Sequence, residues 1–328
     1  MAQDPETKSR IWNHHPDLPI PVSPILSWPP QPLAWLKWIS AYWLTLSAVT
    51  VELALAVVVY TWFQPSWDEM QVLALGWAAQ IWLRNLILLL LVAGGLHVWF
   101  ITLKGQGHSL KFDARDQTRH NGHFTFRNQV ADNMFWSIAS SLSFWTLYEI
   151  GYFWAAANGY APRISAVEHP VWFVLWLVLI PIWSSFHFYW AHRLLHWPPL
   201  YKLAHSLHHR NINIGPWAGI SMHPVEGALY FSTLLVHFVV PSHPIHFLFH
   251  GYVNGLNPCV SHSGFEGVVA RNRKRLNTGD FFHQLHHRYF ECNYGTAEMP
   301  WDVIFGSFHD GSEEATRATR ERKKQMYT

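Results

Sequence analysis

Cysteine and charged residues are both scarce in this chain. Only two cysteines, Cys259 and Cys292, occur among 328 residues, which excludes a disulfide framework and a thiolate metal site. Charged residues make up 13% of the chain, and the formal net charge of +2 is too small to favour nucleic acid as a partner. We therefore expect no nucleic-acid partner. The N-terminus also lacks the short apolar core of a cleavable signal peptide, so membrane insertion would depend on helices of the mature chain.

Apolar residues, tryptophan and histidine are abundant instead. Half of the residues are apolar and 20 are tryptophan, which concentrates at membrane–water interfaces. Histidine occurs 23 times, as often as lysine and arginine together. A metal site in a chain that is rich in histidine and poor in cysteine favours ions that accept imidazole, such as iron, zinc or copper.

Four apolar segments each reach the roughly 20 residues that are needed to cross the hydrocarbon core of a membrane. They are Leu33–Phe63, Leu73–Leu103, Met134–Ala157 and Val171–Trp190. A fifth segment, Ala228–Val260, is interrupted by prolines, which favours a re-entrant hairpin or two short helices. Basic residues concentrate between the second and third segments and after the fourth, which places the N-terminus and the C-terminal half on the cytoplasmic side.

These patterns predict an all-α membrane protein with about four transmembrane helices and a re-entrant hairpin. We divide the chain into a polar N-terminal segment (1–32), a transmembrane base (33–190), a C-terminal region (191–311) and a charged C-terminal tail (312–328). A multi-pass protein with its C-terminal half in the cytoplasm fits a bacterial inner membrane or the endoplasmic reticulum.

Glu52, Arg84 and Glu149 are ionisable residues that fall within the predicted spans. Such groups usually face the interior of a helix bundle or a cavity. We expect an ion pair between helices, with Glu52 and Arg84 as the candidate partners. The alternative is that Glu149 lines a path for a substrate.

Three histidine boxes follow the fourth apolar segment, one of the form HxxxH and two of the form HxxHH. On a helix, positions i, i+3 and i+4 share one face, so each box is predicted to direct two or three imidazoles to the same point. A single zinc site takes three or four ligands, so eight histidines imply two metal ions that share a pocket. The eight are His192, His196, His205, His208, His209, His283, His286 and His287. His187 and His250 lie beside apolar runs, where packing is the favoured role, but they stay open as ligands.

The sequence around these boxes resembles the fatty acid hydroxylase and sterol desaturase superfamily, and the resemblance covers Phe186–Gly311. Its motifs are closest to those of the sterol desaturases and sterol methyl oxidases. The elements that carry the resemblance are Tyr189–His196, Tyr201–His205, His223–Glu226, Ser261–Phe265, His283–His287, Asn293–Gly295, Trp301–Asp302 and Phe305–Ser307. Gln284 stands where many members carry an acidic residue, which leaves the subfamily open.

The resemblance implies a cytoplasmic helical cap on a four-helix membrane base. The cap would be the catalytic side and would carry a di-iron centre at the mouth of an apolar substrate tunnel. It adds His223 and His262 to the eight box histidines, which gives about five ligands for each iron and leaves a position for dioxygen. It also implies dioxygen as co-substrate and two electrons from a separate carrier protein and its reductase. Glu226, Asn293 and Asp302 are candidates for orienting the imidazoles by hydrogen bonds. Turn formation or helix capping is the alternative role for Asn293 and Asp302.

We therefore expect a membrane di-iron oxygenase that hydroxylates or desaturates an unactivated C–H bond of a sterol-like lipid. Such a bond has no acidic proton and no leaving group, so the cofactor must supply the difficult step. The alternatives are a fatty acyl, sphingolipid or carotenoid hydroxylase and, from another class, a zinc-dependent membrane hydrolase. A metal transporter would place its histidines within the spans, whereas these boxes lie outside them. The basic stretch Arg271–Arg275 would suit either an acidic electron carrier or anionic lipid head groups.

Overall fold

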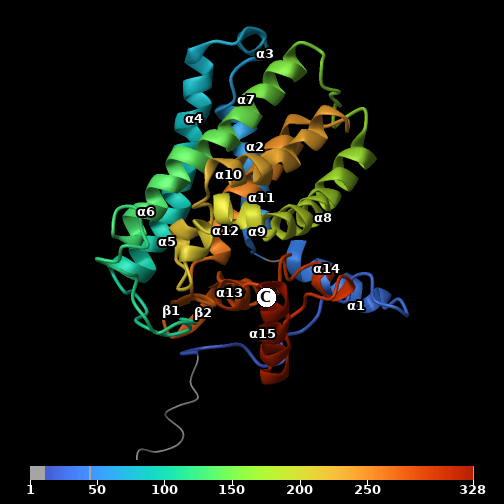
Figure 1. The fold of residues 1–328 in the computed structure, drawn as a ribbon. Helices are drawn as coiled ribbons and strands as arrows, with labels where there is room; N and C mark the ends of the chain where they lie inside the picture. The colour runs from blue at the N-terminus through green and yellow to red at the C-terminus, as the bar shows by residue number, and fades with distance from the viewer. Residues whose placement is uncertain (1–11, 44–45, 328) are drawn as a thin grey trace, which may run out of the picture.

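The computed structural model describes residues 12–43 and 46–327, and the described chain is mostly helical (Figure 1). The α-helices are α1 (Pro32–Trp43), α2 (Ala48–Trp62), α3 (Trp67–Met70), α4 (Leu75–Leu89), α5 (Gly95–His97), α6 (Gln129–Trp136), α7 (Ser143–Ala157), α8 (Pro170–Leu195), α9 (Pro198–Leu200), α10 (Pro224–Phe231), α11 (Pro244–Gly255), α12 (Asn257–Ser261), α13 (Phe281–Tyr289), α14 (Trp301–Ile304) and α15 (Glu313–Tyr327). The π-helical turns are Leu90–Gly94, Val98–Thr102, Ser137–Leu142 and Tyr201–His205, and the 3-10 helices are His208–Arg210, Pro216–Ala218 and Ser232–Phe238. Strands β1 (Gly267–Ala270) and β2 (Arg273–Asn277) pair antiparallel as a small hairpin, which the all-α prediction did not include.

Two helices among the described residues are long and apolar enough to cross a membrane. One runs over Leu75–Thr102 and joins α4 and α5 through π-helical turns, and the other is α8. In the most apolar part of each helix most residues are not buried inside the protein, as lipid-facing helices require. The predicted spans Leu73–Leu103 and Val171–Trp190 coincide with these two helices.

The predicted span Leu33–Phe63 is divided between α1 and α2, with residues 44 and 45 outside the described residues. Helix α2 begins at Ala48 because Ser47 caps it. The Ser47 side chain accepts a hydrogen bond from the Thr50 amide, and the Thr50 hydroxyl accepts one from the Ser47 amide. Helix α2 is apolar but has only 15 residues.

The other two predicted apolar segments are also helical. Met134–Ala157 lies within one uninterrupted helical stretch that comprises α6, a π-helical turn and α7. Ala228–Val260 is helical on both sides of a break between residues 238 and 244, where two of its prolines fall. Its second arm, α11, packs against α2, α7 and α8 and is buried along almost its whole length.

Close packing of α11 on α7 depends on a glycine. A Cβ atom on Gly255 would lie 2.7 Å from the ring of Trp145, which is itself fully buried. Only glycine therefore allows the two helices to approach this closely. A second contact is the stack of Tyr152 on Phe247, whose ring centroids are 4.2 Å apart.

Arg84 pairs across helices, but its partner is Glu149 and not Glu52. The Arg84 guanidinium donates to one oxygen of the Glu149 carboxylate, and Asn85 Nδ2 donates to the other at 2.9 Å. The predicted partner was wrong because α4 packs against α7, which carries Glu149, whereas α2 carries Glu52.

The C-terminal region forms a cap at one end of the helix bundle. Figure 1 shows α2, α4, α7, α8 and α11 in the upper part of the molecule, with α13, α14, α15 and the hairpin below them. The described part of the polar N-terminal segment runs along this cap. The Asn13 amide donates to the Phe112 carbonyl and the Ile20 amide donates to the Asp310 carbonyl, both at 2.9 Å.

Candidate metal centre

The predicted histidines come from the end of the long helix α8 and from short helical segments. His192 lies in the last turn of α8 and His196 follows that helix as its C-cap. His205 ends a π-helical turn, and the next 3-10 helix carries His208 and His209. His262 follows α12, while the third box lies on α13 (Phe281–Tyr289). Helix α13 begins where it does because the Asp280 carboxylate accepts a hydrogen bond from the Phe282 amide at 2.9 Å.

Nine of the ten predicted histidines lie together in two groups, and all nine are buried. We call these group one and group two. Group one consists of His192, His196, His205, His209 and His286. Group two consists of His208, His262, His283 and His287. Within each group the potential ligand atoms all lie within 4.8 Å of one another.

The boxes do not correspond to the groups. The first box contributes both of its histidines to group one, as predicted. The other two boxes each direct two histidines to one group, within the predicted two or three. His205 and His209 belong to group one and His283 and His287 to group two, while the remaining histidine of each box, His208 or His286, belongs to the other group. Tandem histidines point in different directions from the backbone, so each HH pair connects the two groups.

The ring nitrogens of each group converge as metal ligands do. His209 Nε2 lies 3.2 Å from His196 Nε2 and 3.1 Å from His286 Nε2. A neutral ring nitrogen carries one hydrogen or one lone pair, so it cannot form ordinary hydrogen bonds to both. In group two the Nε2 atoms of His262 and His287 are 3.1 Å apart. Ligands at a metal–imidazole distance of about 2.1 Å have neighbouring nitrogens about 3.0–3.4 Å apart, so the residues of each group fit a metal ion.

Burial keeps these imidazoles neutral. It lowers the pKa of His205 to about 3 and the pKa of His208 to about 4. Burial and repulsion between neighbouring rings also lower the pKa of His196, His209, His262, His283, His286 and His287. A neutral imidazole retains the lone pair that a metal ion needs. The buried Nε2 of His283 has no hydrogen-bond partner among the described residues, which also fits a site for an ion.

Several rings are oriented by acceptors at their other nitrogen. His192 Nδ1 donates to the Tyr294 carbonyl at 2.7 Å, and His286 Nδ1 donates to the Cys292 carbonyl at 2.6 Å. His205 Nδ1 donates to the Glu226 carboxylate at 2.8 Å. These bonds fix the tautomer in which Nε2 carries the lone pair toward the group.

Of the three residues predicted to orient imidazoles, only Glu226 has a direct hydrogen bond to a histidine of the groups. Asp302 acts at one remove, because its carboxylate accepts from the Tyr294 and Gly295 amides, each at 2.8 Å. It thereby holds in place the Tyr294 backbone, whose carbonyl accepts the hydrogen bond from His192. Asn293 Nδ2 donates to the Phe282 and His309 carbonyls, both at 3.0 Å, so it ties α13 to the segment before α15.

Glu291 was missed by the sequence analysis. Its buried carboxylate lies 3.6 Å from His196 Nδ1 and accepts a hydrogen bond from the Tyr294 hydroxyl at 2.6 Å. The motifs gave no signal for it, because an acidic residue in a polar segment is usually exposed.

His223 lies outside both groups. Its Nδ1 caps α10 by accepting a hydrogen bond from the Val225 amide at 3.2 Å. His187 and His250 also lie outside the groups. His187 Nε2 is 3.0 Å from the Ser232 hydroxyl, and His250 Nδ1 is 3.0 Å from His237 Nε2, so both have the packing role that was favoured for them.

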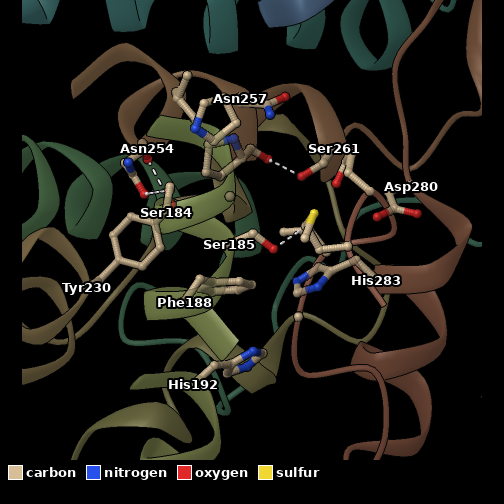
Figure 2. A pocket seen from close by; sticks show the side chains of 18 of the residues that line it. Ser184, Ser185, Phe188, His192, Tyr230, Asn254, Asn257, Ser261, Asp280 and His283 are labelled. Atoms are coloured by element: carbon tan, nitrogen blue, oxygen red, sulfur yellow. Dashed lines mark hydrogen bonds between the residues drawn. The ribbon is translucent and has the colours of Figure 1, made fainter. Parts of the chain in front are cut away.

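A cavity of about 270 Å³ leads to the histidine groups. Its wall is mainly apolar and includes His192, His205, His208, His262 and His283 from both groups. Figure 2 shows Phe188 between His192 and Ser184 on the same helix, with Tyr230 and Asn254 on the side of Ser184. Ser184 and His192 are eight residues apart on α8, which corresponds to about 12 Å along the helix axis. The lining of the cavity thus extends along α8 from Ser184 to His192, a residue of group one.

A family model described as fatty acid hydroxylase matches residues 176–307, the part of the chain that contains all nine grouped histidines. Over this region the chain is similar to the fatty acid hydroxylase and sterol desaturase superfamily. The superfamily model therefore covers the cavity wall on α8 and both histidine groups.

Members of the superfamily that the chain resembles include sterol desaturases. A Delta(7)-sterol 5(6)-desaturase of Aspergillus fumigatus is 32% identical over 170 residues, which cover 50% of this chain and 46% of that protein. The enzyme of that name in Candida glabrata is 36% identical over 124 residues, which cover 37% of this chain and 32% of that protein. The Saccharomyces cerevisiae enzyme is 26% identical over 199 residues, which cover 59% of this chain and 53% of that protein. The chain thus spans about half or less of the length of the curated relatives it matches. No solved structure matches it.

Proposed function

We propose that the protein is a membrane-embedded di-iron oxygenase that hydroxylates or desaturates an unactivated C–H bond of a sterol-like lipid. The observation that carries this proposal is the pair of neutral histidine groups at the end of an apolar cavity. The relatives that the chain matches are named as sterol desaturases, which favours a sterol-like substrate over a fatty acyl, sphingolipid or carotenoid one.

The proposed ligand set is the ten predicted histidines, five from group one and four from group two together with His223. In His223 the cap of α10 occupies Nδ1, so Nε2 is the atom that remains for a metal. Two iron ions held here would supply activation of dioxygen and removal of hydrogen from carbon. Hydroxylation then consumes the C–H bond, one O₂, two electrons and two protons, and yields an alcohol and one water. Desaturation consumes two C–H bonds with the same O₂, electrons and protons, and yields an alkene and two waters.

The protein's own residues bind and align the substrate and exclude water. The apolar wall on α8, including Phe188, would hold the lipid along the channel so that one carbon lies beside the histidines. Exclusion of water protects a reactive oxidant from side reactions. Glu226 and the Tyr294 carbonyl keep two imidazoles in fixed orientation during turnover.

For the membrane, we propose four spans: α2, Leu75–Thr102, the stretch from α6 to α7, and α8. The arm formed by α11 would be the re-entrant element. Residues 1–32 and 191–311 would then lie on the cytoplasmic side with the charged tail (312–328), and residues 33–190 would form the base. The positive-inside tendency of the loops supports this orientation. The electrons would come from a separate carrier protein and its reductase.

The proposal is tested by metal analysis of the purified protein and by product analysis under ¹⁸O₂ with sterol-like and fatty acyl substrates. We expect about two iron ions per chain, and a product that requires iron, dioxygen and electrons. Label in an alcohol product would indicate hydroxylation, and a product two hydrogens lighter would indicate desaturation. Turnover that persists without iron or dioxygen would exclude an oxygenase and favour the zinc hydrolase.

Variants of each histidine group provide the matched controls. His286→Ala in group one and His208→Ala in group two should each lower the metal content and abolish turnover, while the protein remains inserted in the membrane. His123→Ala changes an exposed histidine and should leave both properties unchanged. Wild-type metal content and activity in either group variant would remove that residue from the ligand set.

A further inference from the structure

Phe290 connects the histidine site to the surface of the cap. Its ring stacks on the ring of His209, a member of group one, with centroids 4.8 Å apart and an interplanar angle of 30°. His209 is buried, whereas Phe290 is only half-buried. A single aromatic ring therefore separates a proposed metal ligand from the protein surface.

The backbone of Phe290 has an unfavourable conformation. It follows the last residue of α13 with φ +73° and ψ −58°, a region that suits glycine and rarely holds a bulky residue. The Phe290 amide donates to the His286 carbonyl at 2.7 Å and so completes the helix end. A phenylalanine here costs conformational free energy that glycine would not, which indicates that the ring itself has a role.

The exposed side of the ring is covered by positive charge. Lys323 Nζ lies 4.3 Å from the centroid of the Phe290 ring, a cation–π contact. Lys323 belongs to α15, which packs against α13 (Figure 1). Between Arg317 and Lys324 this helix carries five basic residues and one acidic residue. The surface above Phe290 is therefore suited to an acidic partner.

We propose that Phe290, Lys323 and the basic half of α15 form the docking site of a small acidic one-electron carrier protein, and that electrons enter through the Phe290–His209 stack. This inference rests on the proposed oxygenase function, which needs external electrons. The hairpin stretch Arg271–Arg275 is also basic, but Lys274 is paired with Glu266 at 2.6 Å. The ring contact with a grouped histidine favours the α15 surface over the hairpin.

The electron count follows from the proposed reaction. Each carrier molecule is oxidised by one electron, so one turnover requires two carrier encounters. These two electrons and two protons from water join the electrons of the broken C–H bond in reducing O₂, which gives the alcohol and one water. In the desaturation reaction the second C–H bond supplies the remaining electrons, and both oxygen atoms become water.

Binding is measured separately from catalysis. The probe is oxidised plant-type [2Fe–2S] ferredoxin, an acidic one-electron carrier, titrated onto the zinc-loaded full-length protein at low and high ionic strength. Lys323→Glu should weaken binding about five- to tenfold at low salt and less at high salt, because an exposed charge acts through screened attraction. Lys274→Glu is the matched charge reversal on the hairpin and should change the dissociation constant less than twofold.

Electron transfer is measured on the iron-loaded protein without oxygen, as the rate at which saturating reduced ferredoxin is oxidised. Phe290→Gly should slow this rate at least tenfold, with ferredoxin affinity within about twofold of wild type. Glycine suits the backbone at this position, so loss of folding would not explain a slower rate. Phe290→Tyr keeps the ring and should restore most of the rate. Reduced methyl viologen, a small cation that needs no docking site, should reduce wild-type and Lys323→Glu proteins equally.

The outcomes separate the two proposals. Wild-type binding in Lys323→Glu, a larger effect of Lys274→Glu, or no ferredoxin binding by the wild-type protein at low salt would each overturn the docking site. A wild-type transfer rate in Phe290→Gly would overturn the electron path. Iron-loaded wild-type protein that viologen fails to reduce would overturn the proposed redox function, while the zinc-form titration still decides the docking site.

Discussion

Replacing Glu226 should weaken metal binding at group one in two graded steps. Glu226 is buried, lines the cavity, and its carboxylate accepts the hydrogen of His205 Nδ1 at 2.8 Å. Its second oxygen, Oε2, has no hydrogen-bond partner among the described residues. The carboxylate therefore makes one hydrogen bond to His205. Glu226→Gln removes the charge of this acceptor, and Glu226→Ala removes the acceptor itself.

The expected magnitudes follow from the strength of this bond. A glutamine amide oxygen can still accept from His205, so Glu226→Gln exchanges a charged acceptor for a neutral one. Hydrogen bonds to charged groups contribute about 1.5–3 kcal/mol and neutral ones about 0.5–1.5 kcal/mol. The difference of about 1–1.5 kcal/mol corresponds to a five- to twelvefold loss of metal affinity. Glu226→Ala leaves the ring without an orienting partner, for which a loss of about 10–100-fold is expected.

The assay is competition for zinc between the purified protein and a chromophoric chelator. Measurement at pH 8 keeps the wild-type carboxylate ionised, because burial raises the pKa of Glu226 to about 7. Glu298→Gln, a second carboxylate on the cavity wall, is the control and should retain wild-type affinity. Wild-type zinc affinity in Glu226→Ala, or equal losses in Glu226→Ala and Glu298→Gln, would refute the idea that Glu226 orients a metal ligand.

Three further predictions concern stability, each measured by unfolding in detergent. Arg84→Met leaves Glu149 as a buried unpaired carboxylate and should lower the free energy of unfolding by about 3–5 kcal/mol, most of which Arg84→Met/Glu149→Gln should recover; equal stability of single and double variants would contradict this. Gly255→Ala places a methyl group 2.7 Å from the Trp145 ring and should cost about 1–3 kcal/mol, whereas an unchanged melting temperature would show that the helices can separate freely. Burial lowers the pKa of His309 from 6.5 to about 4. The unfolded chain thus binds a proton between these values that the folded protein does not, so stability is full above pH 6.5 and falls toward pH 4; His309→Gln should reduce this loss, and an identical pH profile would argue against it.

The sequence was most informative where hydrophobicity alone decides the structure. Leu73–Leu103 and Val171–Trp190 were predicted as spans, and both are helices long and apolar enough to cross a membrane. The partner predicted for Arg84 was wrong, because hydropathy indicates which segments are helices and does not indicate which helices are in contact. Arg84 pairs with Glu149 because α4 packs against α7 in the tertiary structure.

For the histidine site, too, the sequence predicted which residues take part but not how they are arranged. The boxes identified eight of the nine grouped histidines because imidazoles at such density have few other uses, and the resemblance added His262. The assignment of each histidine to one of the two groups could not be read from spacing, because the tandem histidines of a box point in different directions. This holds for the third box, which lies on the single helix α13, and for the second box, which passes from a π-helical turn at His205 to a 3-10 helix at His208 and His209.

The groups that orient the imidazoles are the part least accessible to sequence reasoning. His192 and His286 donate to the carbonyls of Tyr294 and Cys292, and a backbone carbonyl is present at every residue, so no side-chain pattern marks it. Asp302 differs, because it is a side chain that the sequence displays, and its carboxylate holds the backbone that supplies the Tyr294 carbonyl. The Asp302 carboxylate therefore helps to orient the His192 ring although it makes no hydrogen bond to His192 itself. A mutation there should therefore change the hydrogen bond at His192 Nδ1, and with it the metal affinity of group one, before it changes the ligands themselves.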